Sequence, residues 1–298
     1  MATDLAIKVD VDTERGTRIG VPRLCGLFAE HGIRATFLFS LGPDNTGRAI
    51  RRVFRPGFLA KTARTNVLGV YGLRTLMNGI LWPGPHIASR HSAILRATRD
   101  AGHEVGIHCH DHVRWQDGLA RMKREEVAAE FARAAEEFRR VFGEPARVAG
   151  AAGWQANEFS LQAYDAAGVE YASDCRGSTP FRPRVFGRTF RAPQVPTTLP
   201  TLDELLGRPE FPIGELAQRY LSWLRPDRVN VLTVHAEIEG MAQLEWFAGF
   251  LAQARRAGVR FLRLADVAHS LRSEDLPVCD LIVGRVEGRS GTLALLGC

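Results

Sequence analysis

Short apolar runs alternate along this chain with longer stretches in which apolar residues recur every three or four positions. Residues 21–31 have this helical spacing in Val21, Leu24 and Phe28, and residues 123–142 repeat it over a greater length. The short runs have the length and the composition of buried strands. They comprise Ile7–Thr13, Ile33–Phe39, Glu104–Cys109, Arg147–Ala151, Val169–Tyr171, Val229–His235 and Val259–Leu262. Helices and strands that alternate in this way predict an α/β fold.

Glycine marks the junction between several of these helices and the strands that follow. Gly32, Gly102, Gly168 and Gly258 each stand at such a junction. Glycine tolerates the left-handed conformation just past a helix end, so these positions are typical helix stops. Helices that run directly into strands build parallel βαβ units. The pattern therefore predicts an irregular, closed or nearly closed (β/α) barrel of six or seven strands.

Three stretches depart from this alternation. Residues 48–85 interrupt the helix after the second strand and are predicted to form an amphipathic basic insert. Residues 174–212 are rich in Pro, Arg and Thr and are expected to form a long loop, which is commonly functional in a compact domain. Residues 273–298 have only a weak strand signal and are interpreted as a C-terminal extension. The main domain would then comprise residues 1–272.

The overall composition is that of a globular protein. The chain has 298 residues, of which 45% are hydrophobic and 24% are charged. It contains no uninterrupted apolar run long enough to span a bilayer. Residues 1–4 have neither the basic nor the apolar region of an export signal. We therefore expect a cytoplasmic protein.

The cysteines give the same expectation about the compartment. The chain has five, an odd number, and their spacing suggests no pairs. They are Cys25, Cys109, Cys175, Cys279 and Cys298. We predict free thiols in a reducing compartment.

The net charge of +6 is concentrated in one part of the chain. No acidic residue lies between Asn45 and Arg99, and this stretch contains ten arginines and lysines. Such a block favours an anionic partner, whether nucleic acid, phosphate or a membrane surface. Because Phe54, Phe58 and Trp82 stand among the basic residues, we favour a helix lying in a membrane interface.

Residues of metal-binding types stand at the ends of two expected strands. Asp10 and Asp12 lie two apart, so their carboxylates project from the same face of the first strand. His108 and His112 stand four apart, a spacing that lets two ring nitrogens converge on one cation. A shared cation would also relieve the repulsion between the carboxylates. These residues predict a site of two histidines and one carboxylate, with a spare carboxylate beside it.

A further histidine, His235, ends the strand Val229–His235 and would join the same ring of polar residues. Two other functions remain open for a chain with these residues. Two histidines and a carboxylate also hold non-haem iron in oxygenases, but an oxygenase would not need Asp10 or His235. A non-catalytic basic module would explain the arginines and leave the aspartates and histidines without a role.

The Asp-Val-Asp, His-x3-His and strand-ending histidine motifs together resemble those of the polysaccharide deacetylase (NodB homology) family. The resemblance implies an irregular (β/α) barrel and metal-dependent hydrolysis of an N-acyl group on a sugar. A closer resemblance, extending to about Leu271, is to deformylases of this family that act on a lipid-linked formamido sugar. It rests on the phrases Asp10–Thr13, Arg15–Arg18, Gly42–Asn45, Asp111–His112, Ala151–Trp154, Ser173–Gly177 and His235–Gly240.

The closer resemblance implies a particular substrate and location. Formate would be removed from 4-deoxy-4-formamido-L-arabinose on undecaprenyl phosphate, on the route to aminoarabinose-modified lipid A and polymyxin resistance. The expected partners are this lipid-linked amino sugar and the anionic inner-membrane surface, with the enzyme peripheral on the cytoplasmic face. No nucleic acid or obligate protein partner is expected. The alternative is a deacetylase of another N-acylated sugar or polysaccharide.

The same resemblance implies a role for each candidate residue. Asp12, His108 and His112 would hold a divalent ion such as zinc, manganese or cobalt. Asp10 would act as general base, and His235 would protonate the leaving nitrogen.

Other residues would support these groups. Asp174 would keep His235 protonated. Arg15, Arg18, Trp154 and Arg176 are the candidate substrate-binding residues.

This chain also departs from the family pattern. Val11 separates two aspartates that are usually adjacent, so the ligand and the base could be exchanged. The usual Arg-x-Pro motif, whose arginine steadies the base, is replaced by Ala151–Trp154, and Arg176 is the substitute that we consider. His110 stands where an aromatic residue is expected, and we predict that it points away from the metal.

Overall fold

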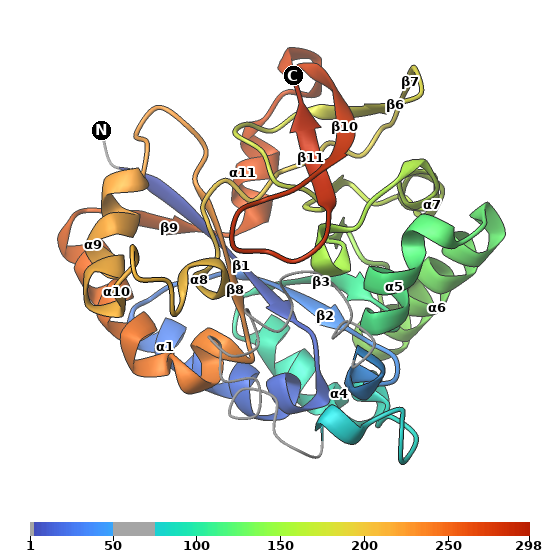
Figure 1. The fold of residues 1–298 in the computed structure, drawn as a ribbon, viewed down its shortest axis with the longest axis horizontal. Coiled ribbons are helices and arrows are strands. Elements are labelled where there is room, and N and C mark those ends of the chain that lie inside the picture. Colours follow the sequence, from blue (N-terminus) through green and yellow to red (C-terminus); the bar gives the residue numbers. More distant parts are fainter. Residues whose placement is uncertain (1–2, 50–74) are drawn as a thin grey trace.

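The computed structural model of the chain describes residues 3–49 and 75–298. Within them, the main sheet has seven parallel strands in the order β5-β4-β3-β2-β1-β8, with β9 paired to the start of β1 (Figure 1). The strands are β1 (Asp4–Val11), β2 (Thr36–Ser40), β3 (Glu104–Cys109), β4 (Val148–Ala149), β5 (Tyr171–Ala172), β8 (Val231–His235) and β9 (Arg260–Leu262). The predicted parallel βαβ architecture is confirmed.

Helices surround the outer face of this curled sheet (Figure 1). They are α1 (Val21–Glu30), α4 (Ile87–Asp100), α5 (His112–Gly118), α6 (Arg124–Phe142), α7 (Glu158–Ala167), α8 (Leu202–Leu205), α9 (Ile213–Trp223) and α10 (Leu244–Arg256). A further helix, α11 (Leu264–Ser270), packs instead against the inner face of the sheet, in the apolar cluster that contains Ala6 of β1. Helix α1 packs between α10 and α4, and α6 packs between α4 and α7. The helices predicted at residues 21–31 and 123–142 are confirmed as α1 and α6.

An extended segment, residues 193–199, joins the two edges of the sheet. The edge strands β5 and β8 are not paired with each other in the described part of the chain. Instead, the amide of Val195 donates to the carbonyl of Ala172 in β5 at 2.8 Å. The amide of Leu199 donates to the carbonyl of Val231 in β8 at 3.1 Å. This segment accounts for the irregular, nearly closed form of the barrel.

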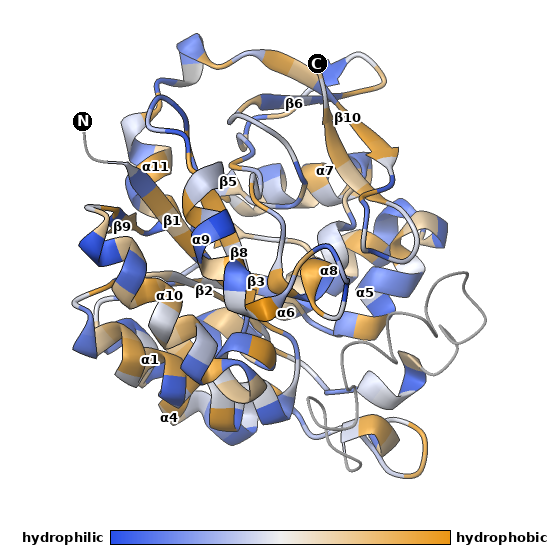
Figure 2. Ribbon diagram, turned by 60° about the vertical axis from the view of Figure 1, so that its left-hand side comes forward, coloured by the Kyte–Doolittle hydropathy of each residue, from blue (hydrophilic) through white to orange (hydrophobic). Residues whose placement is uncertain are grey.

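Successive side chains of β1 point to opposite faces of the sheet, and the two faces pack against different sets of residues. Leu5, Ile7 and Val9 point outward into the large apolar cluster between sheet and helices. In Figure 2, hydrophobic residues (orange) alternate with hydrophilic ones (blue) along helices such as α1 and α4. Ala6 points inward and packs in a smaller cluster inside the barrel. Lys8 follows on the same face, and like Ala6 it is fully buried. The barrel interior therefore changes from apolar to charged toward the carboxyl ends of the strands.

A second, four-stranded sheet unites the long segment 174–212 with the C-terminal extension (Figure 1). Its order is β11-β10-β6-β7, and the strands are β6 (Arg182–Val185), β7 (Arg188–Thr189), β10 (Val278–Gly284) and β11 (Leu293–Gly297). β10 pairs in parallel with β6, and β11 pairs in antiparallel with β10. The segment that we predicted as a loop therefore contains strands, because the extension supplies their partner. The division of the chain at residue 272 stays a prediction.

The pairing of the extension also corrects our prediction of five free thiols. Cys279 and Cys298 form a disulfide, with their Cα atoms 5.4 Å apart. Antiparallel pairing of β10 and β11 brings these residues together although 19 positions separate them. Cys25, Cys109 and Cys175 are free, as predicted.

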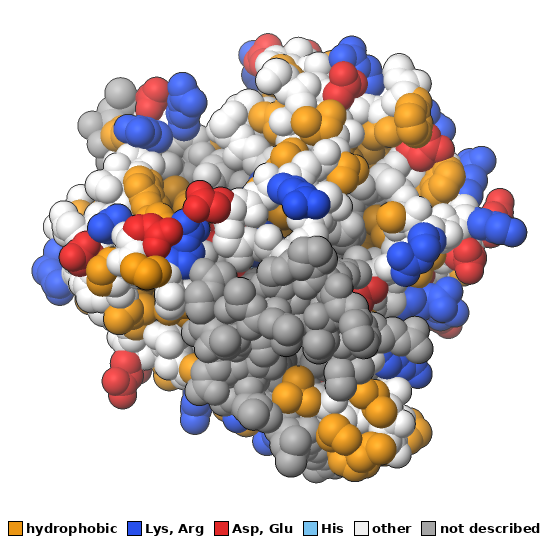
Figure 3. All heavy atoms as spheres, viewed as in Figure 1, with side chains coloured by type: hydrophobic (Ala, Val, Ile, Leu, Met, Phe, Trp, Pro, Cys, Tyr) orange, Lys and Arg blue, Asp and Glu red, His pale blue; other side chains and the backbone are white. Residues whose placement is uncertain are grey.

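Part of the predicted insert, residues 50–74, lies outside the described residues. Its described flank exposes Ile80, Leu81 and Trp82. Hydrophobic side chains gather on the surface at the lower right of Figure 3, over the segment that leads into α4. No helix in the described ranges has both the length and the hydropathy needed to cross a bilayer.

Two irregular turns pack closely beside the end of β1. One is the π-helical turn Gly16–Gly20, and the other is Ile238–Ala242, which follows β8. A Cβ on Gly20 would lie 2.0 Å from the carbonyl oxygen of Ala236. The backbones can approach this closely only because position 20 has no side chain. This contact fixes the loop after β1 against the loop after β8.

We expect the variant Gly20→Ala to lose stability, because the new methyl group would have to displace backbone atoms. The free energy of unfolding should fall by about 1–3 kcal/mol, the usual cost of overpacking. Gly26→Ala is the matched control, since Gly26 lies in α1 and its Cβ would meet nothing within 4 Å. This control should be more stable than wild type by about 0.5–1 kcal/mol. Denaturant unfolding measures both, and equal effects of the two substitutions would contradict the close contact.

Candidate active site

The carboxyl ends of three strands bring the predicted polar residues together. Asp10 in β1 is the register partner of His235 in β8, so both side chains point into the barrel. Asp12 follows the end of β1 on the same face, and His108 lies near the end of β3. His112 begins α5, whose N-cap residue Asp111 accepts from the amide of Arg114 at 3.0 Å. The spacing of four between the histidines thus spans a strand end and a helix start.

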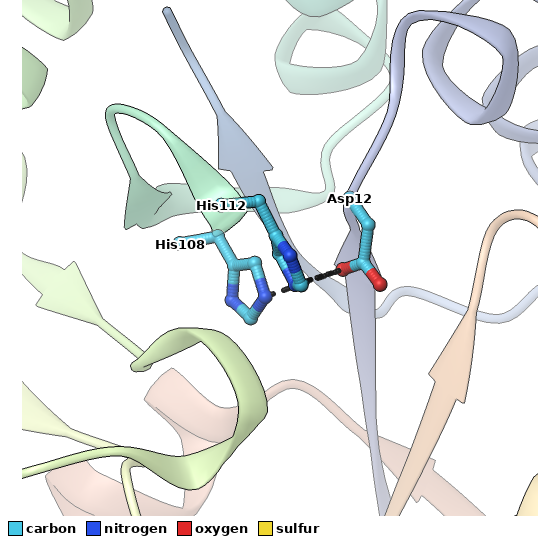
Figure 4. Close-up of side chains that lie close together, drawn as sticks. All are labelled: Asp12, His108 and His112. Carbon is cyan, nitrogen blue, oxygen red and sulfur yellow. Dashed lines mark ion pairs between the residues drawn. The ribbon is translucent and has the colours of Figure 1, made fainter. Parts of the chain in front are cut away.

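Asp12, His108 and His112 form a compact cluster (Figure 4). One ligand-type atom from each lies within 4.8 Å of the others. The Asp12 Oδ1 atom is 3.2 Å from Nε2 of His108 and 3.4 Å from Nε2 of His112. Both rings extend toward this carboxylate (Figure 4). Among the described residues, these three bring their ligand atoms close enough together to hold one metal ion.

The donor atoms of this cluster fit a divalent cation. Asp12 Oδ1 is buried and accepts no hydrogen bond from the described residues. The Nδ1–H group of His108 donates to the carbonyl oxygen of Gly150 at 2.6 Å, so Nε2 is free to face the cluster. A metal-binding histidine commonly donates its second ring nitrogen in this way, which fixes its tautomer and orientation. Two imidazole nitrogens and one carboxylate oxygen are a suitable ligand set with open positions.

Charges within the cluster favour an ionised carboxylate at Asp12. Burial alone would raise its pKa, but the positive charge of His112 and the contacts with both histidines hold the pKa well below its ordinary value. For His108, burial alone would lower the pKa, because it disfavours the charged ring. The negative carboxylates of Asp10 and Asp12 outweigh this effect, so the pKa of His108 is raised. The cluster therefore favours a positive charge next to Asp12.

Asp10 is held by a lysine from its own strand. The carboxylate is buried, and its Oδ2 lies 3.3 Å from Nζ of Lys8, which is also fully buried. Lys8 Nζ in turn donates to the carbonyl oxygen of Ser173 at 3.0 Å. Asp10 Oδ1 has no hydrogen-bond partner in the described ranges. Lys8 thus orients Asp10 in place of the missing motif arginine, and it leaves one carboxylate oxygen available.

We did not single out Lys8 from the sequence, although the sequence contains the signal. Lys8 is the one charged residue before Asp10 within the apolar part of β1, residues 5–9. Lys8, Asp10 and Asp12 are spaced two residues apart, so their side chains must lie on the same face of the strand. A lysine at a buried strand position requires an anionic partner.

His235 lies beside Asp10, but the prediction that Asp174 is its partner and keeps it protonated is wrong. Asp174 is fully buried and accepts from the amide of Ala151 at 2.7 Å and from the side chain of Gln194 at 2.8 Å. Burial raises its pKa to about 6 despite these bonds. His235 Nδ1 is buried without a partner in the described part of the chain. The folding of the 193–199 segment against β5 therefore gives Asp174 an amide partner instead of the histidine.

Two glutamates that follow β8 accept hydrogen bonds from backbone amides of the site. Glu237 Oε1 accepts from the amides of Asp12 and Thr13, at 3.1 and 2.9 Å, and from the Thr13 hydroxyl. Glu239 Oε2 accepts from the amide of His235 at 2.8 Å, and burial raises the pKa of Glu239 to about 8. These contacts fix the backbone of one predicted ligand and of the predicted acid.

His110 points away from the cluster, as predicted. Its Nδ1 lies 3.5 Å from Oε1 of Glu130, a buried glutamate on α6. Its ring also packs near His86, with ring centroids 6.0 Å apart. Strand alternation alone would place His110 on the same side as His108, but β3 ends at Cys109, and the chain turns before His110 so that its ring faces α6.

The predicted substrate-binding residues lie at different depths. Trp154 is only 1% exposed, and its Nε1 donates to Thr197 Oγ1 at 3.1 Å. Arg176 is also buried and donates to the carbonyl oxygens of Thr197 and Leu199 and to Glu204. Trp154 and Arg176 thus form the wall of the site beside His235, whose ring centroid is 6.2 Å from that of Trp154.

The two remaining candidates lie in the turn after β1. Arg18 is exposed and pairs with Glu14 at 3.3 Å. Arg15 is half-buried and has a partner of its own. Neither residue belongs to the cluster of Asp12, His108 and His112. Their contact with the substrate stays a prediction.

Comparisons with known proteins agree with this architecture. The profile of the family described as polysaccharide deacetylase matches residues 11–172. The chain is 36% identical to a Shewanella sediminis protein over 294 residues, which cover 98% of this chain and 94% of that one. It is 33% identical to a Wigglesworthia glossinidia brevipalpis protein over 94% of this chain and 97% of the relative. Both relatives are named probable 4-deoxy-4-formamido-L-arabinose-phosphoundecaprenol deformylase ArnD.

A solved structure shows the same fold at low sequence identity. It is the crystal structure of a Mycobacterium smegmatis protein described as a polysaccharide deacetylase. The TM-score is 0.64 and the identity is 17%, with 96% of both chains covered. The resemblance expected from the motifs is confirmed by these comparisons.

Proposed function

Because this chain belongs to the polysaccharide deacetylase family, we propose that it is a metal-dependent deformylase of a lipid-linked amino sugar. The substrate would be 4-deoxy-4-formamido-L-arabinose on undecaprenyl phosphate, the compound in the names of both relatives. The product would serve the modification of lipid A with aminoarabinose. The observation that carries the proposal is a cluster of two histidines and a carboxylate beside a lysine-held aspartate and a histidine.

The side chains support hydrolysis of an amide. Asp12, His108 and His112 would hold a divalent ion such as zinc, manganese or cobalt, whose charge acidifies water and polarises the formyl carbonyl. Asp10 has a free carboxylate oxygen and would take the proton of the attacking water.

His235 completes the reaction from the neighbouring strand. It would give a proton to the sugar nitrogen as the carbon–nitrogen bond breaks, so that formate and a free amine are formed. Lys8 restricts Asp10 to one orientation, and Glu239 restricts the backbone of His235. Asp174 would act only by supporting the wall of the site at Ala151.

The second candidate is a deacetylase of another N-acylated sugar or polysaccharide, because the same groups hydrolyse either amide. A matched pair of substrates separates the two. The N-formyl and N-acetyl forms of the same aminoarabinose phosphodiester differ by one methyl group. We expect faster hydrolysis of the formyl form, and faster release of acetate than of formate would favour the second candidate.

We also propose that the enzyme works at an anionic membrane surface, on the cytoplasmic face of the inner membrane. The substrate remains in the bilayer, so the active site must approach it. The exposed Ile80, Leu81 and Trp82 support this proposal, because an interfacial segment needs apolar side chains that face outward. Of the basic residues in the insert, Arg48 is described and exposed, whereas Arg51, Arg52, Arg55, Lys61, Arg64 and Arg74 lie outside the described residues.

Charge reversal of Arg51, Arg52 and Arg55 to Glu should weaken binding to anionic vesicles. Each basic residue near such a surface contributes about 1 kcal/mol, so binding should also fall as salt increases. Vesicle sedimentation measures both effects. Reversal of Arg225 and Arg228, which are exposed beyond α9, serves as the control. Equal vesicle binding by the two variants would contradict a membrane role for the insert.

A further inference from the structure

The loop between β10 and β11, residues 285–292, rests on the rim of the candidate active site. Gly288 has a φ of +82°, and a Cβ there would lie 2.3 Å from the carbonyl oxygen of Glu204 in α8. On the other side, the side chain of Gln155 donates to the carbonyl oxygen of Thr292 at 2.6 Å. Figure 1 shows this loop, in red, reaching from the second sheet toward β8 and α8. The C-terminal extension therefore contributes directly to the wall of the site.

Arg289 is the residue that this loop presents to the site. Its guanidinium carbon is 4.3 Å from the ring centroid of Trp154, the residue that packs beside His235. Its Nη1 is 3.3 Å from Oε1 of Glu204, and its side chain is only 11% exposed. Burial lowers the pKa of Arg289, but the negative charges of Asp203, Glu204 and Asp12 outweigh this effect, so that the pKa is raised above its ordinary value. Arg289 is thus a fixed cation within electrostatic range of a predicted metal ligand.

The hydrogen bonds of Arg289 differ from those of its neighbour Arg176. Arg176 donates to two backbone carbonyls and to Glu204, so its donors serve the fold. Arg289 shares the same oxygen of Glu204 through one nitrogen, Nη1. A guanidinium has five N–H donors in a planar fork that matches the oxygens of a phosphate. Arg289 therefore has the geometry to bind an anion beside Trp154.

We propose that Arg289 is a specificity-determining residue that binds the phosphodiester of the substrate, so that the C-terminal extension completes the binding site. This inference rests on the proposed function, in which a neutral formamide and an anionic phosphate lie on opposite sides of one sugar ring. The predicted metal ligands would receive the formamide, and Arg289, beyond Trp154, would receive the phosphate. The amide itself has no charge that would require a second cation.

The test compares a charged and a neutral form of the same sugar. The charged probe is a short-chain prenyl phosphodiester of 4-deoxy-4-formamidoarabinose, and the neutral probe is its methyl glycoside. The variant Arg289→Met removes the charge at similar length, and Arg289→Lys keeps a charge without the planar fork. Arg285→Met is the matched control, because Arg285 is an exposed arginine of the same loop. Metal-loaded proteins are used throughout.

We expect Arg289→Met to raise KM for the phosphodiester about 10- to 100-fold, the scale of a lost hydrogen bond to a charged group. The ratio of kcat/KM for the charged over the neutral probe should fall by at least about 10-fold. Arg289→Lys should recover part of this ratio, and Arg285→Met should keep the wild-type ratio. An equal loss on both probes, or no loss on either, would overturn the proposal and leave Arg289 a structural residue.

Calorimetric binding of the same probes separates this inference from the proposed function, because binding needs no turnover. Wild-type protein that binds the phosphodiester no tighter than the glycoside would overturn the role of Arg289, even if formate is released. A preference for the phosphodiester that is lost in Arg289→Met would uphold the anion site. Absence of formate release in that case would count against the deformylase activity alone.

Discussion

Asp12→Ala, His108→Ala and His112→Ala should each remove the bound metal and most of the activity. The three side chains converge within 4.8 Å, so each would supply one of few protein ligands. Loss of a group that merely supports a ligand costs about 10- to 100-fold, and loss of a ligand should therefore exceed about 100-fold. Elemental analysis and the rate of formate release, measured on the same preparations, test this expectation.

His110→Ala is the internal control for these variants. His110 lies between the two predicted ligands in sequence, but its ring faces Glu130. The variant should keep its metal and the larger part of its activity. Equal loss of metal from His110→Ala and His112→Ala would contradict the assignment. Full activity of the wild-type protein after thorough metal removal would contradict metal dependence altogether.

Asp10→Asn and His235→Ala should keep the metal and lose turnover. Each removes a group proposed to move a proton, and such groups contribute about 100-fold or more to a rate. Asp10 lies beside the cluster but is paired with Lys8, so its replacement by an amide should leave the ligands in place. Single-turnover rates and metal content together measure the effect.

The comparison of Asp10→Asn with Asp12→Asn decides between the two carboxylates. We expect Asp12→Asn to lose the metal and Asp10→Asn to retain it. If Asp10→Asn loses the metal and Asp12→Asn keeps it, then ligand and base are exchanged. The separation of the two aspartates by Val11 made this exchange conceivable from the sequence.

Local patterns were sufficient to predict most of the barrel and the centre of the site. Strand alternation placed Asp10 and Asp12 on one face, and the junction after β3 brought His108 and His112 together. These predictions depend on only a few consecutive residues and on the rule that parallel strands end on one side. The same alternation also contained the information on Lys8.

Pairings between distant parts of the chain could not be predicted in this way. Asp174 lies after β5, but its partner Gln194 comes from a segment whose position depends on how the barrel closes. β6 and β10 have weak strand signals, and each is stabilised by the other. For the same reason, neither the pairing of Cys279 with Cys298 nor the placement of Arg289 over Trp154 could be derived from spacing.

Mass spectrometry of the products formed from the lipid-linked formamido sugar tests the proposed activity most directly. Metal-loaded protein is incubated with 4-deoxy-4-formamido-L-arabinose on undecaprenyl phosphate, and Asp12→Ala serves as the blank. We predict that wild-type protein releases formate and the free amino sugar in equal amounts, whereas the variant leaves the substrate intact. Intact substrate after incubation with metal-loaded wild-type protein would contradict the deformylase activity.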